Sequence, residues 1–537
     1  MKFFNVVIVV SLIILCAFNA YFFHVSYQNF ICLHRSVALI EDQMKSKQMF
    51  ASDSSGSLSA DCTTAVSSQL WEKLQKNLTN TVLQLFVTAQ QHNVLLPFKI
   101  PKQGACTGSA FIINQDGEII TNAHVVNGAT SIMAQMVAFG KHQFELELIG
   151  IMPEKDFALL KFKVQDLEMI KTKLGSVPFL KLGDSDKVMR SQEILALGYP
   201  LGQQSLKSTT GVISGRETGM IQMSAPINPG NSGGPSLNCR GEVIGINTSG
   251  IMGAQNVGYI IPINDLKIFL KDIRVGGLVR KPYIGVYQSL ATPELLKALK
   301  NPLPGGTYVV DVLIDSPLYQ KLLPGDMIYE INGIPVDLYG EMSVPWSEDK
   351  VSTAEYISRL FVGQKVSLVV YRNGKRMAFE CTFDRKKLLP VHQVFAEYEE
   401  LPYECFGGYV VMPLMLNHLP LLGPLVPSLG KYTEEKNQSK PLLIVTHVFP
   451  DSPAHRTRLS LVGSILKKVN DMPVATLQDL HKALKQSGDI ITIETEDHIV
   501  IALDKNRVIQ SEPILAAKFG YKITPCMQQF CSSGSMS

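Results

Sequence analysis

The chain has 537 residues, long enough for about three domains, because a single hydrophobic core stops growing near roughly 250–300 residues. Apolar residues make up 46% and charged residues 18%, which excludes a disordered chain and allows some membrane character. The 50 basic and 47 acidic residues nearly cancel, so no long-range field favours nucleic acid or an acidic substrate, and no nucleic-acid partner is expected.

The N-terminus is an apolar segment. Between Lys2 and Arg35 there is no Asp, Glu, Lys or Arg, and residues 3–23 are almost wholly apolar. About 20 apolar residues at helical rise match the hydrocarbon core of a bilayer, so the segment predicts a transmembrane helix. A cleaved secretory signal is the competing interpretation, but no good small-x-small cleavage site follows. We expect residues 1–25 to be a membrane anchor or an uncleaved signal.

A polar spacer follows the apolar segment. Residues 51–60 are too small and polar to pack, which predicts a stalk, and Trp71 to Leu78 has helical spacing. Residues 26–77 are therefore expected to form a stalk and a short helix. From Thr81, short β-rich runs continue to about residue 270, separated by turn signals and without intervening helices. This pattern predicts an all-β domain.

The C-terminal half contains an internal repeat. Gly325 to Val336 matches Gly463 to Val474 without a gap, and Asp315-Ser-Pro317 upstream matches Asp451-Ser-Pro453. In each copy a Gly turn precedes an apolar strand, and a helical stretch leads to a last strand pair. Two copies of one small domain are therefore expected.

The strongest chemical signal is the segment Asn228-Pro-Gly-Asn-Ser-Gly-Gly-Pro235. A serine hydroxyl is a poor nucleophile alone and needs a general base, plus donors aimed at the tetrahedral oxyanion. The glycines let the backbone turn so that the N–H groups of Gly230 and Ser232 can point at one oxygen and form an oxyanion hole. By itself such a segment is as often an ordinary loop.

Two further residues complete a candidate catalytic triad. Residues 111–126 predict a strand, a tight Asp-Gly hairpin and a second strand that ends at His124, whose imidazole suits proton transfer near neutrality. Asp156 precedes an apolar strand and would hold the tautomer of His124 and stabilise the imidazolium. Each residue alone is more often structural. Together, His124, Asp156 and Ser232 lie in that order in one β-rich segment and predict nucleophilic catalysis.

With these motifs the sequence resembles the Deg/HtrA family of serine proteases. The segments that resemble its signatures are Thr121-Asn-Ala-His124, Asp156-Phe-Ala-Leu-Leu160, Ile227 to Pro235 and Gly241 to Thr248. Gln255 to Pro262 and Phe406 to Val411 are similar to the plant-type Deg branch, which carries a protease and two PDZ domains. The resemblance covers the chain from about Thr81 to the C-terminal region.

The resemblance implies a multi-domain, mainly β protein in which a trypsin-like double β-barrel protease is followed by two PDZ domains, with the N-terminal transmembrane helix in front. The expected domains are a trypsin-like serine protease at 78–272, a first PDZ domain at 279–386, a second PDZ domain at 404–510 and a C-terminal tail at 511–537. The nine cysteines are scattered, which favours free thiols and predicts no zinc site.

The resemblance also implies the activity and its setting. Family members cleave unfolded or damaged proteins, need no metal or ATP, and assemble from trimers into larger cages. We therefore expect a serine endopeptidase with no cofactor and no metal, acting on unfolded or misfolded proteins as a homo-oligomer of trimers or their multiples. Its expected location is membrane-anchored, with the protease in the periplasm or an equivalent extracytoplasmic or organellar compartment.

The residues beside the scissile bond indicate a substrate preference. Ile227, Ile246, Asn247 and Thr248 are expected to line the substrate pocket and carry no charge, which predicts cleavage after small or medium aliphatic residues. Where the family commonly has Gln-Thr-Asp-Ala-Ala, this chain has Gln222-Met-Ser-Ala-Pro226. The lost acidic residue and the added proline are expected to change how the pocket loop switches between inactive and active arrangements.

The first repeat carries a candidate peptide site. Tyr283, Ile284, Gly285 and Val286 resemble the loop with which PDZ domains receive the terminal carboxylate of a peptide, while the peptide adds as a strand. Hydrophobic C-terminal peptides are thus expected partners. Phe406-Gly-Gly-Tyr409 is the more divergent counterpart, for which subunit contacts and peptide capture are equally expected.

Two alternatives to an active enzyme remain from the sequence. The first is a catalytically silent PDZ scaffold that binds misfolded chains, and the intact triad argues against it. The second is a membrane-tethered adaptor working only through its PDZ pair, which leaves residues 104–262 without a role.

Overall fold

The computed structural model describes residues 61–250, 256–281, 284–302, 304–314, 316–383 and 388–533. The membrane helix expected within residues 1–25 and the stalk at 51–60 lie outside these ranges. Within them, no helix combines the length and the apolar character that a membrane crossing requires. The first described element is helix α2, Asp61–Leu78, which includes the helical stretch predicted from Trp71 onward.

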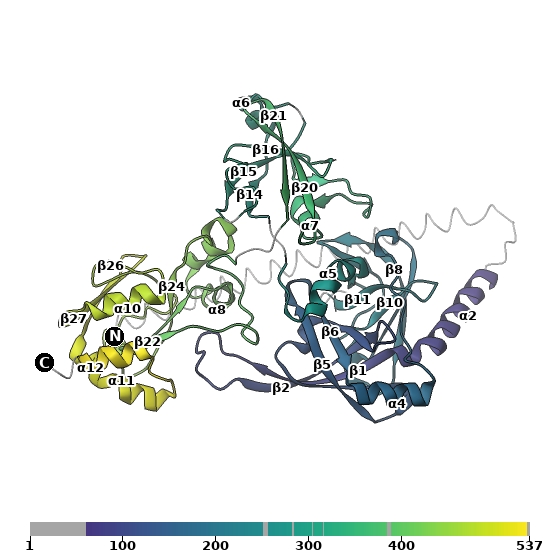
Figure 1. The fold of residues 1–537 in the computed structure, drawn as a ribbon, viewed down its shortest axis with the longest axis horizontal. Coiled ribbons are helices and arrows are strands. Elements are labelled where there is room, and N and C mark those ends of the chain that lie inside the picture. Colours follow the sequence, from purple (N-terminus) through teal and green to yellow (C-terminus); the bar gives the residue numbers. More distant parts are fainter. Residues whose placement is uncertain are drawn as a thin grey trace, which may run out of the picture. The chain divides into compact units, whose positions relative to one another are not determined.

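A first closed β-barrel is formed by six strands (Figure 1). They pair in the order β5-β4-β1-β2-β3-β6, and β6 pairs back onto β5, which closes the ring. The hairpin predicted at Asp116-Gly117 joins β2 to β3, and Gly117 has a φ of 73°. The strand bounds are Val82–Gln91 (β1), Lys102–Ile112 (β2), Glu118–Thr121 (β3), Ala129–Gln135 (β4), Gln143–Met152 (β5) and Phe157–Phe162 (β6).

A second closed barrel follows, with strands in the order β10-β11-β12-β9-β8-β7. The double β-barrel implied by the family resemblance is therefore confirmed. Segment 228–234, which contains the candidate nucleophile, leads into β10. The strand bounds are Glu193–Gly198 (β7), Lys207–Glu217 (β8), Met220–Met223 (β9), Pro235–Leu237 (β10), Val243–Gly250 (β11) and Gly258–Pro262 (β12).

The barrel region contains longer helices, so the expectation of a region without intervening helices was wrong. Helix α4, Val164–Leu174, follows β6, and helix α5, Ile263–Val275, follows β12. Helix α5 buries Ile263, Leu266, Phe269 and Ile273, which share one helical face. Many apolar residues of α5 are β-branched or aromatic, and these residue types also favour strands. The segment is helical because its buried apolar residues lie on one face of a helix.

The two copies of the repeat form sheets with matching strand order. The first sheet runs β14-β15-β16-β20-β21 with β17 on β16, and the second runs β23-β24-β25-β27-β28 with β26 on β25. The first-copy bounds are Val286–Ser289 (β14), Thr307–Val312 (β15), Met327–Ile331 (β16), Ile334–Pro335 (β17), Lys365–Arg372 (β20), Lys375–Thr382 (β21) and Thr353–Ile357 (α7). The second-copy bounds are Tyr409–Pro413 (β23), Leu443–Val448 (β24), Ile465–Val469 (β25), Met472–Pro473 (β26), Ile490–Thr495 (β27), Val500–Asp504 (β28) and Leu477–Lys485 (α10).

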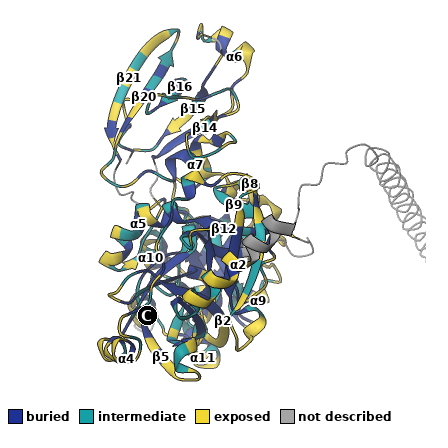
Figure 2. Ribbon diagram, turned by 90° about the vertical axis from the view of Figure 1, so that its right-hand side faces the viewer, coloured by how far each residue is buried: buried dark blue, intermediate teal, exposed yellow. Residues whose placement is uncertain are grey.

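The segment expected to form a C-terminal tail, 511–537, contains two helical stretches, which end at Phe519 and at Ser533. Helix α11, Lys505–Phe519, crosses the expected boundary at residue 510, and helix α12, Pro525–Ser533, follows it. Met527 and Phe530 of α12 are buried in the core of the second repeat. Figure 2 shows that α4 and the described part of α2 expose much of their surface, whereas a barrel strand such as β12 is largely buried.

Candidate active site

The two barrels each contribute to the candidate triad. His124 lies in the short helix α3, Ala123–Val126, just after β3, and Asp156 lies just before β6. Strands β3 and β6 pair with Thr121 opposite Ala158, which brings the ends that carry His124 and Asp156 together. Ser232 comes from the loop before β10 of the second barrel.

His124 and Asp156 make the contact that the sequence predicts. The Nδ1 atom of His124 is 2.9 Å from both carboxylate oxygens of Asp156, and the backbone N–H of His124 donates to Oδ1 at 3.0 Å. With its proton on Nδ1, the imidazole keeps the Nε2 lone pair for a nucleophile. Asp156 therefore sets the tautomer that a general base requires.

Asp156 has a left-handed backbone conformation, and its carboxylate accepts a hydrogen bond from a second residue besides His124. Its φ of 56° and ψ of 45° lie in the left-handed region, which costs on the order of 1 kcal/mol for a residue other than glycine. The hydroxyl of Thr248 donates to Oδ2 at 2.7 Å, and the side-chain amide of Asn122 donates to the backbone carbonyl of Asp156 at 2.9 Å. These contacts fix the carboxylate against His124.

The Ser232 hydroxyl is in a resting orientation. It donates to the backbone carbonyl of Thr248 at 2.8 Å, and it makes no hydrogen bond with His124 within the described residues. A rotation about the Cα–Cβ bond is the change required to bring the Ser232 Oγ atom to Nε2 of His124.

The oxyanion donors are free. No described residue accepts a hydrogen bond from the N–H of Gly230 or of Ser232. The carbonyl of Pro229 accepts from the N–H of Leu201 at 2.6 Å, and the N–H of Gly230 points the opposite way because the peptide is trans. Gly230 has a φ of 98°, and a Cβ there would lie 2.4 Å from the carbonyl oxygen of Tyr199. Glycine is therefore required at this turn, and both amides remain available to an oxyanion.

Ser109 supports this loop and was not predicted from the sequence. Its hydroxyl donates to the carbonyl of Gly230 at 2.7 Å and accepts the N–H of Tyr199 at 2.9 Å, and its backbone N–H donates to the carbonyl of Ser232 at 2.8 Å. The residue is fully buried. The run Thr107-Gly-Ser-Ala110 carries no chemical pattern that would have indicated this role.

Of the four residues expected to line the substrate pocket, Ile227 alone is half-buried, and it packs against the core of the second barrel. Ile246 is fully buried in the core. Asn247 is also buried, where its amide nitrogen donates to the carbonyl of Leu197 and its oxygen accepts from Ser236. Thr248 lies beside Asp156, as described above.

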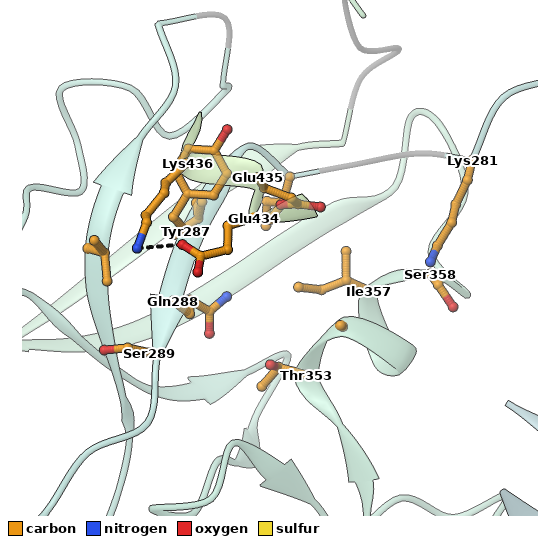
Figure 3. A pocket seen from close by; sticks show the side chains of 14 residues that line it. Lys281, Tyr287, Gln288, Ser289, Thr353, Ile357, Ser358, Glu434, Glu435 and Lys436 are labelled. Atoms are coloured by element: carbon orange, nitrogen blue, oxygen red, sulfur yellow. Dashed lines mark ion pairs between the residues drawn. The ribbon is translucent and has the colours of Figure 1, made fainter. Parts of the chain in front are cut away.

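The candidate peptide site of the first repeat coincides with a cavity of about 580 Å³. Ile284 and Val286 line it, Gly285 has a φ of 71°, and Tyr283 lies outside the described residues. Figure 3 shows residues 287–289 on one side of the cavity and Thr353 and Ile357 of α7 on another. The segment 434–436 also lines it, with an ion pair between Glu434 and Lys436.

Comparison with known families gives two matches. Residues 108–246 match the trypsin-like peptidase domain, and residues 394–524 match a PDZ domain. The first range includes His124, Asp156 and Ser232, and the second includes strands β23 to β28 with helix α11.

Comparison with individual proteins gives relatives that are named as proteases. The chain is 33% identical over 299 residues to the putative serine protease HhoB of Synechocystis sp., covering 50% of this chain and 66% of that protein, just under two thirds. It is 28% identical to a probable periplasmic serine endoprotease DegP-like of Hahella chejuensis, covering 72% and 76%, and 27% identical to the chloroplastic Protease Do-like 2 of Arabidopsis thaliana, covering 79% and 71%. Among solved structures, the HtrA-type protease AlgW with tripeptide is 28% identical, with a TM-score of 0.46, covering 59% of this chain and 98% of that one.

Proposed function

The chain belongs to the Deg/HtrA family of trypsin-like peptidases with PDZ domains, and on that premise we propose that it is a serine endopeptidase. The observation that carries the proposal is the arrangement at the junction of the barrels. There the Nδ1 atom of His124 is paired with Asp156, and the N–H groups of Gly230 and Ser232 face no described acceptor.

The proposed reaction is acyl transfer through Ser232. The Ser232 hydroxyl rotates away from the carbonyl of Thr248, gives its proton to Nε2 of His124 and attacks the scissile carbonyl. The amides of Gly230 and Ser232 stabilise the oxyanion, and Asp156 stabilises the imidazolium. His124 then protonates the leaving amine. In the second half of the reaction His124 takes a proton from water, which attacks the acyl carbonyl, and His124 returns the proton to the departing Ser232 oxygen.

The substrates are proposed from chemistry and family membership. Unfolded or misfolded proteins fit because an extended segment must reach Ser232, and the half-buried Ile227 favours an aliphatic side chain before the scissile bond. Hydrophobic peptide C termini would bind the first PDZ domain, where Ile284 and Val286 line the cavity. The relatives named as periplasmic or chloroplastic support an extracytoplasmic or organellar location. A homo-oligomer of trimers and a membrane anchor within residues 1–25 complete the proposal.

The test is cleavage of unfolded casein by the chain and by its Ser232→Ala variant. We expect cleavage that the substitution abolishes, and Thr248→Ser, which keeps the hydroxyl beside Asp156, serves as a matched active control. Cleavage that persists in Ser232→Ala would assign the activity to another residue.

One observation favours a second candidate, the catalytically silent PDZ scaffold, because the Ser232 hydroxyl is bonded to Thr248 and not to His124. A fluorophosphonate probe separates the two functions, since it reacts only with a serine that a base activates. Labelling of Ser232 supports the enzyme, and the absence of both labelling and cleavage, with hydrophobic C-terminal peptides present, would establish the scaffold.

A further inference from the structure

A second cavity, of about 650 Å³, lies beside the catalytic loop. Its walls come from the C-terminal end of α2, from strand β1, from the segment between β4 and β5, and from the loop 202–206 that leads into β8. None of the residues that line it belongs to the candidate triad or to the pocket expected beside the scissile bond. The acyl-transfer steps therefore leave this cavity without a role.

Glutamine side chains form a row along one wall of the cavity. Gln84 on β1 lies opposite Gln135 on β4, and Gln135 lies opposite Gln143 at the start of β5. Residues directly opposite each other on neighbouring strands project from the same face of a sheet, so the three amides are neighbours. Phe86, two residues beyond Gln84, lies on the same face and adds an aromatic ring to the wall.

The polar groups of the cavity have unused hydrogen-bonding capacity. The side-chain amides of Gln143 and of Gln204, on the loop 202–206, make no hydrogen bond with another described residue. Lys141 is the one charged residue among those that line the cavity. An amide offers both donors and an acceptor, as a peptide backbone does. The cavity therefore suits a chain whose backbone N–H and C=O groups are not paired with each other, as in an unfolded protein.

One loop joins the cavity to the oxyanion turn. A Cβ on Gly230 would lie 3.2 Å from the Cα of Pro200, so the start of this loop touches the turn that carries an oxyanion donor. The same loop lines the cavity from Gly202 onward. The side-chain amide of Gln84 donates to the carbonyl of Gln203 at 3.2 Å and fixes the loop against β1. The cavity and the oxyanion turn thus share a wall.

Strand β2 sets the distance from the cavity to the nucleophile. The N–H of Ser109 donates to the carbonyl of Ser232, and Thr107, two residues earlier, lies about 7 Å away along the strand. A Cβ on Gly202 would lie 3.8 Å from the hydroxyl of Thr107, so the cavity begins roughly 10 Å from the nucleophile. An extended chain covers about 3.3–3.6 Å per residue and reaches the cavity with about its third residue.

The leaving half of the substrate lies on the side of the cavity. His124 protonates the leaving amine, so the chain after the scissile bond passes the helix α3 that carries His124. This helix borders β2, because the thiol of Cys106 donates to the carbonyl of Val125 at 3.4 Å. Cys106 is followed by Thr107, the residue beside the cavity loop. The segment after the scissile bond is therefore the part of the substrate that reaches the cavity.

We propose that this cavity is an exosite for the substrate segment that starts about three residues after the scissile bond. The glutamine row and Gln204 bind the backbone N–H and C=O groups of an extended, unfolded chain, and Phe86 packs against its side chains. Lys141 favours acidic residues in this segment and disfavours basic ones. The exosite thereby selects unfolded substrates by their unpaired backbone.

Cleavage of matched peptides tests the exosite, and this measurement rests on the proposed protease function. Both peptides carry valine before the scissile bond and the same segment of about three residues after it, and one of them continues with about six serine and glutamine residues. We expect kcat/KM to be about tenfold higher for the longer peptide. Equal kcat/KM for the two peptides would overturn the proposal.

Variants test whether the gain arises in the cavity. Val137 is 45% exposed and lines the cavity, so Val137→Trp fills it without disturbing the core. The ratio of kcat/KM for the long and short peptides should then fall to about one. Val164→Trp, at a 75% exposed site on α4 outside the cavity, is the matched control and should keep the full ratio. A Val137→Trp chain that keeps the full ratio would contradict the proposal.

The charge of Lys141 is tested with the same peptides. One longer peptide continues with aspartate residues and another with lysine residues, and the parent chain should cleave the acidic one with the higher kcat/KM. Lys141→Glu should reverse this preference. A preference that the substitution leaves unchanged would remove Lys141 from the proposed exosite and overturn its assigned selectivity.

Photo-crosslinking to the Ser232→Ala chain tests the exosite without cleavage. The longer peptide carries benzoylphenylalanine at about the fifth position after the bond, and mass spectrometry locates the crosslinked residues. We expect crosslinks in residues 84–86, 135–143 and 202–206, and far fewer when Val137→Trp is added. Crosslinks elsewhere only, or none, would overturn the exosite. If the parent chain cleaves neither peptide, the protease proposal fails and the crosslinks alone decide the exosite.

Discussion

Glu512 makes the stability of the second PDZ domain depend on pH. Burial, the largest effect, and the nearby carboxylate of Glu404 raise its pKa from 4.5 to about 7. Between pH 4.5 and about pH 7, Glu512 is therefore protonated in the folded chain and ionised in the unfolded chain. The stabilisation is fully present below pH 4.5 and is lost as the pH rises through 7. At about 1.4 kcal/mol for each pH unit, the loss approaches about 3 kcal/mol.

The substitution Glu512→Gln removes this ionisation and keeps the contacts. The amide oxygen can accept the N–H of Gly407, and the amide nitrogen can donate to the hydroxyl of Tyr521. We expect the variant to gain up to about 3 kcal/mol over the parent chain at pH 8 and less than about 1 kcal/mol at pH 5. The assay is urea unfolding of the Ser232→Ala chain, followed through hydrogen exchange of residues 404–413.

The difference between variant and parent is the quantity to compare, because His418 in the same domain titrates in the opposite sense. Burial lowers its pKa to about 4. Asp497→Asn, an exposed carboxylate between β27 and β28, is the matched control and should shift stability by less than about 0.5 kcal/mol. A difference that does not grow between pH 5 and pH 8, or a variant less stable than the parent at pH 8, would refute the reasoning.

Three further outcomes are expected. Thr248→Val removes the donor to Asp156 and should lower kcat about tenfold with KM unchanged, measured on a fluorogenic peptide, while Thr248→Ser restores it. Phe98, at the tip of the β1–β2 hairpin, packs in an aromatic cluster of the second PDZ domain. Phe98→Ala should therefore weaken this contact by roughly 2 kcal/mol and speed hydrogen exchange in residues 92–101. Ile100→Ala, at a site that is 92% exposed, is the control and should change neither. Since His418 contacts the carbonyl of Val94 and is neutral when folded, protection of the same tip should fall as the pH drops from 6.5 towards 4, and a flat profile would contradict this.

The candidate triad could be proposed from sequence because each member lies in a short segment whose chemistry is local. His124 follows a hairpin, Asp156 precedes an apolar strand, and Ser232 lies among glycines. The roles of Thr248 and Ser109 were not accessible in the same way. Thr248 reaches Asp156 across 92 positions of sequence, and Ser109 reaches Gly230 across 121, so only the closed barrels bring them together.

The repeat shows the same limit at the level of a domain. Matching glycine, asparagine and proline positions correctly predicted two copies with one strand order. Contacts between a repeat copy and residues outside the repeat could not be predicted from the matching segments. Glu512 lies 105 positions from Gly407, in a helix that follows the last shared strand and that the sequence pattern placed mostly in a tail.

The second copy of the repeat contacts the hairpin that leads to the catalytic loop. The hydroxyl of Thr446 on β24 donates to the carbonyl of Leu95, so this domain holds the tip of the β1–β2 hairpin. Strand β2 runs from that tip to Ser109, whose hydroxyl and N–H bind the carbonyls of Gly230 and Ser232. The second copy of the repeat therefore supports the strand that positions the oxyanion loop.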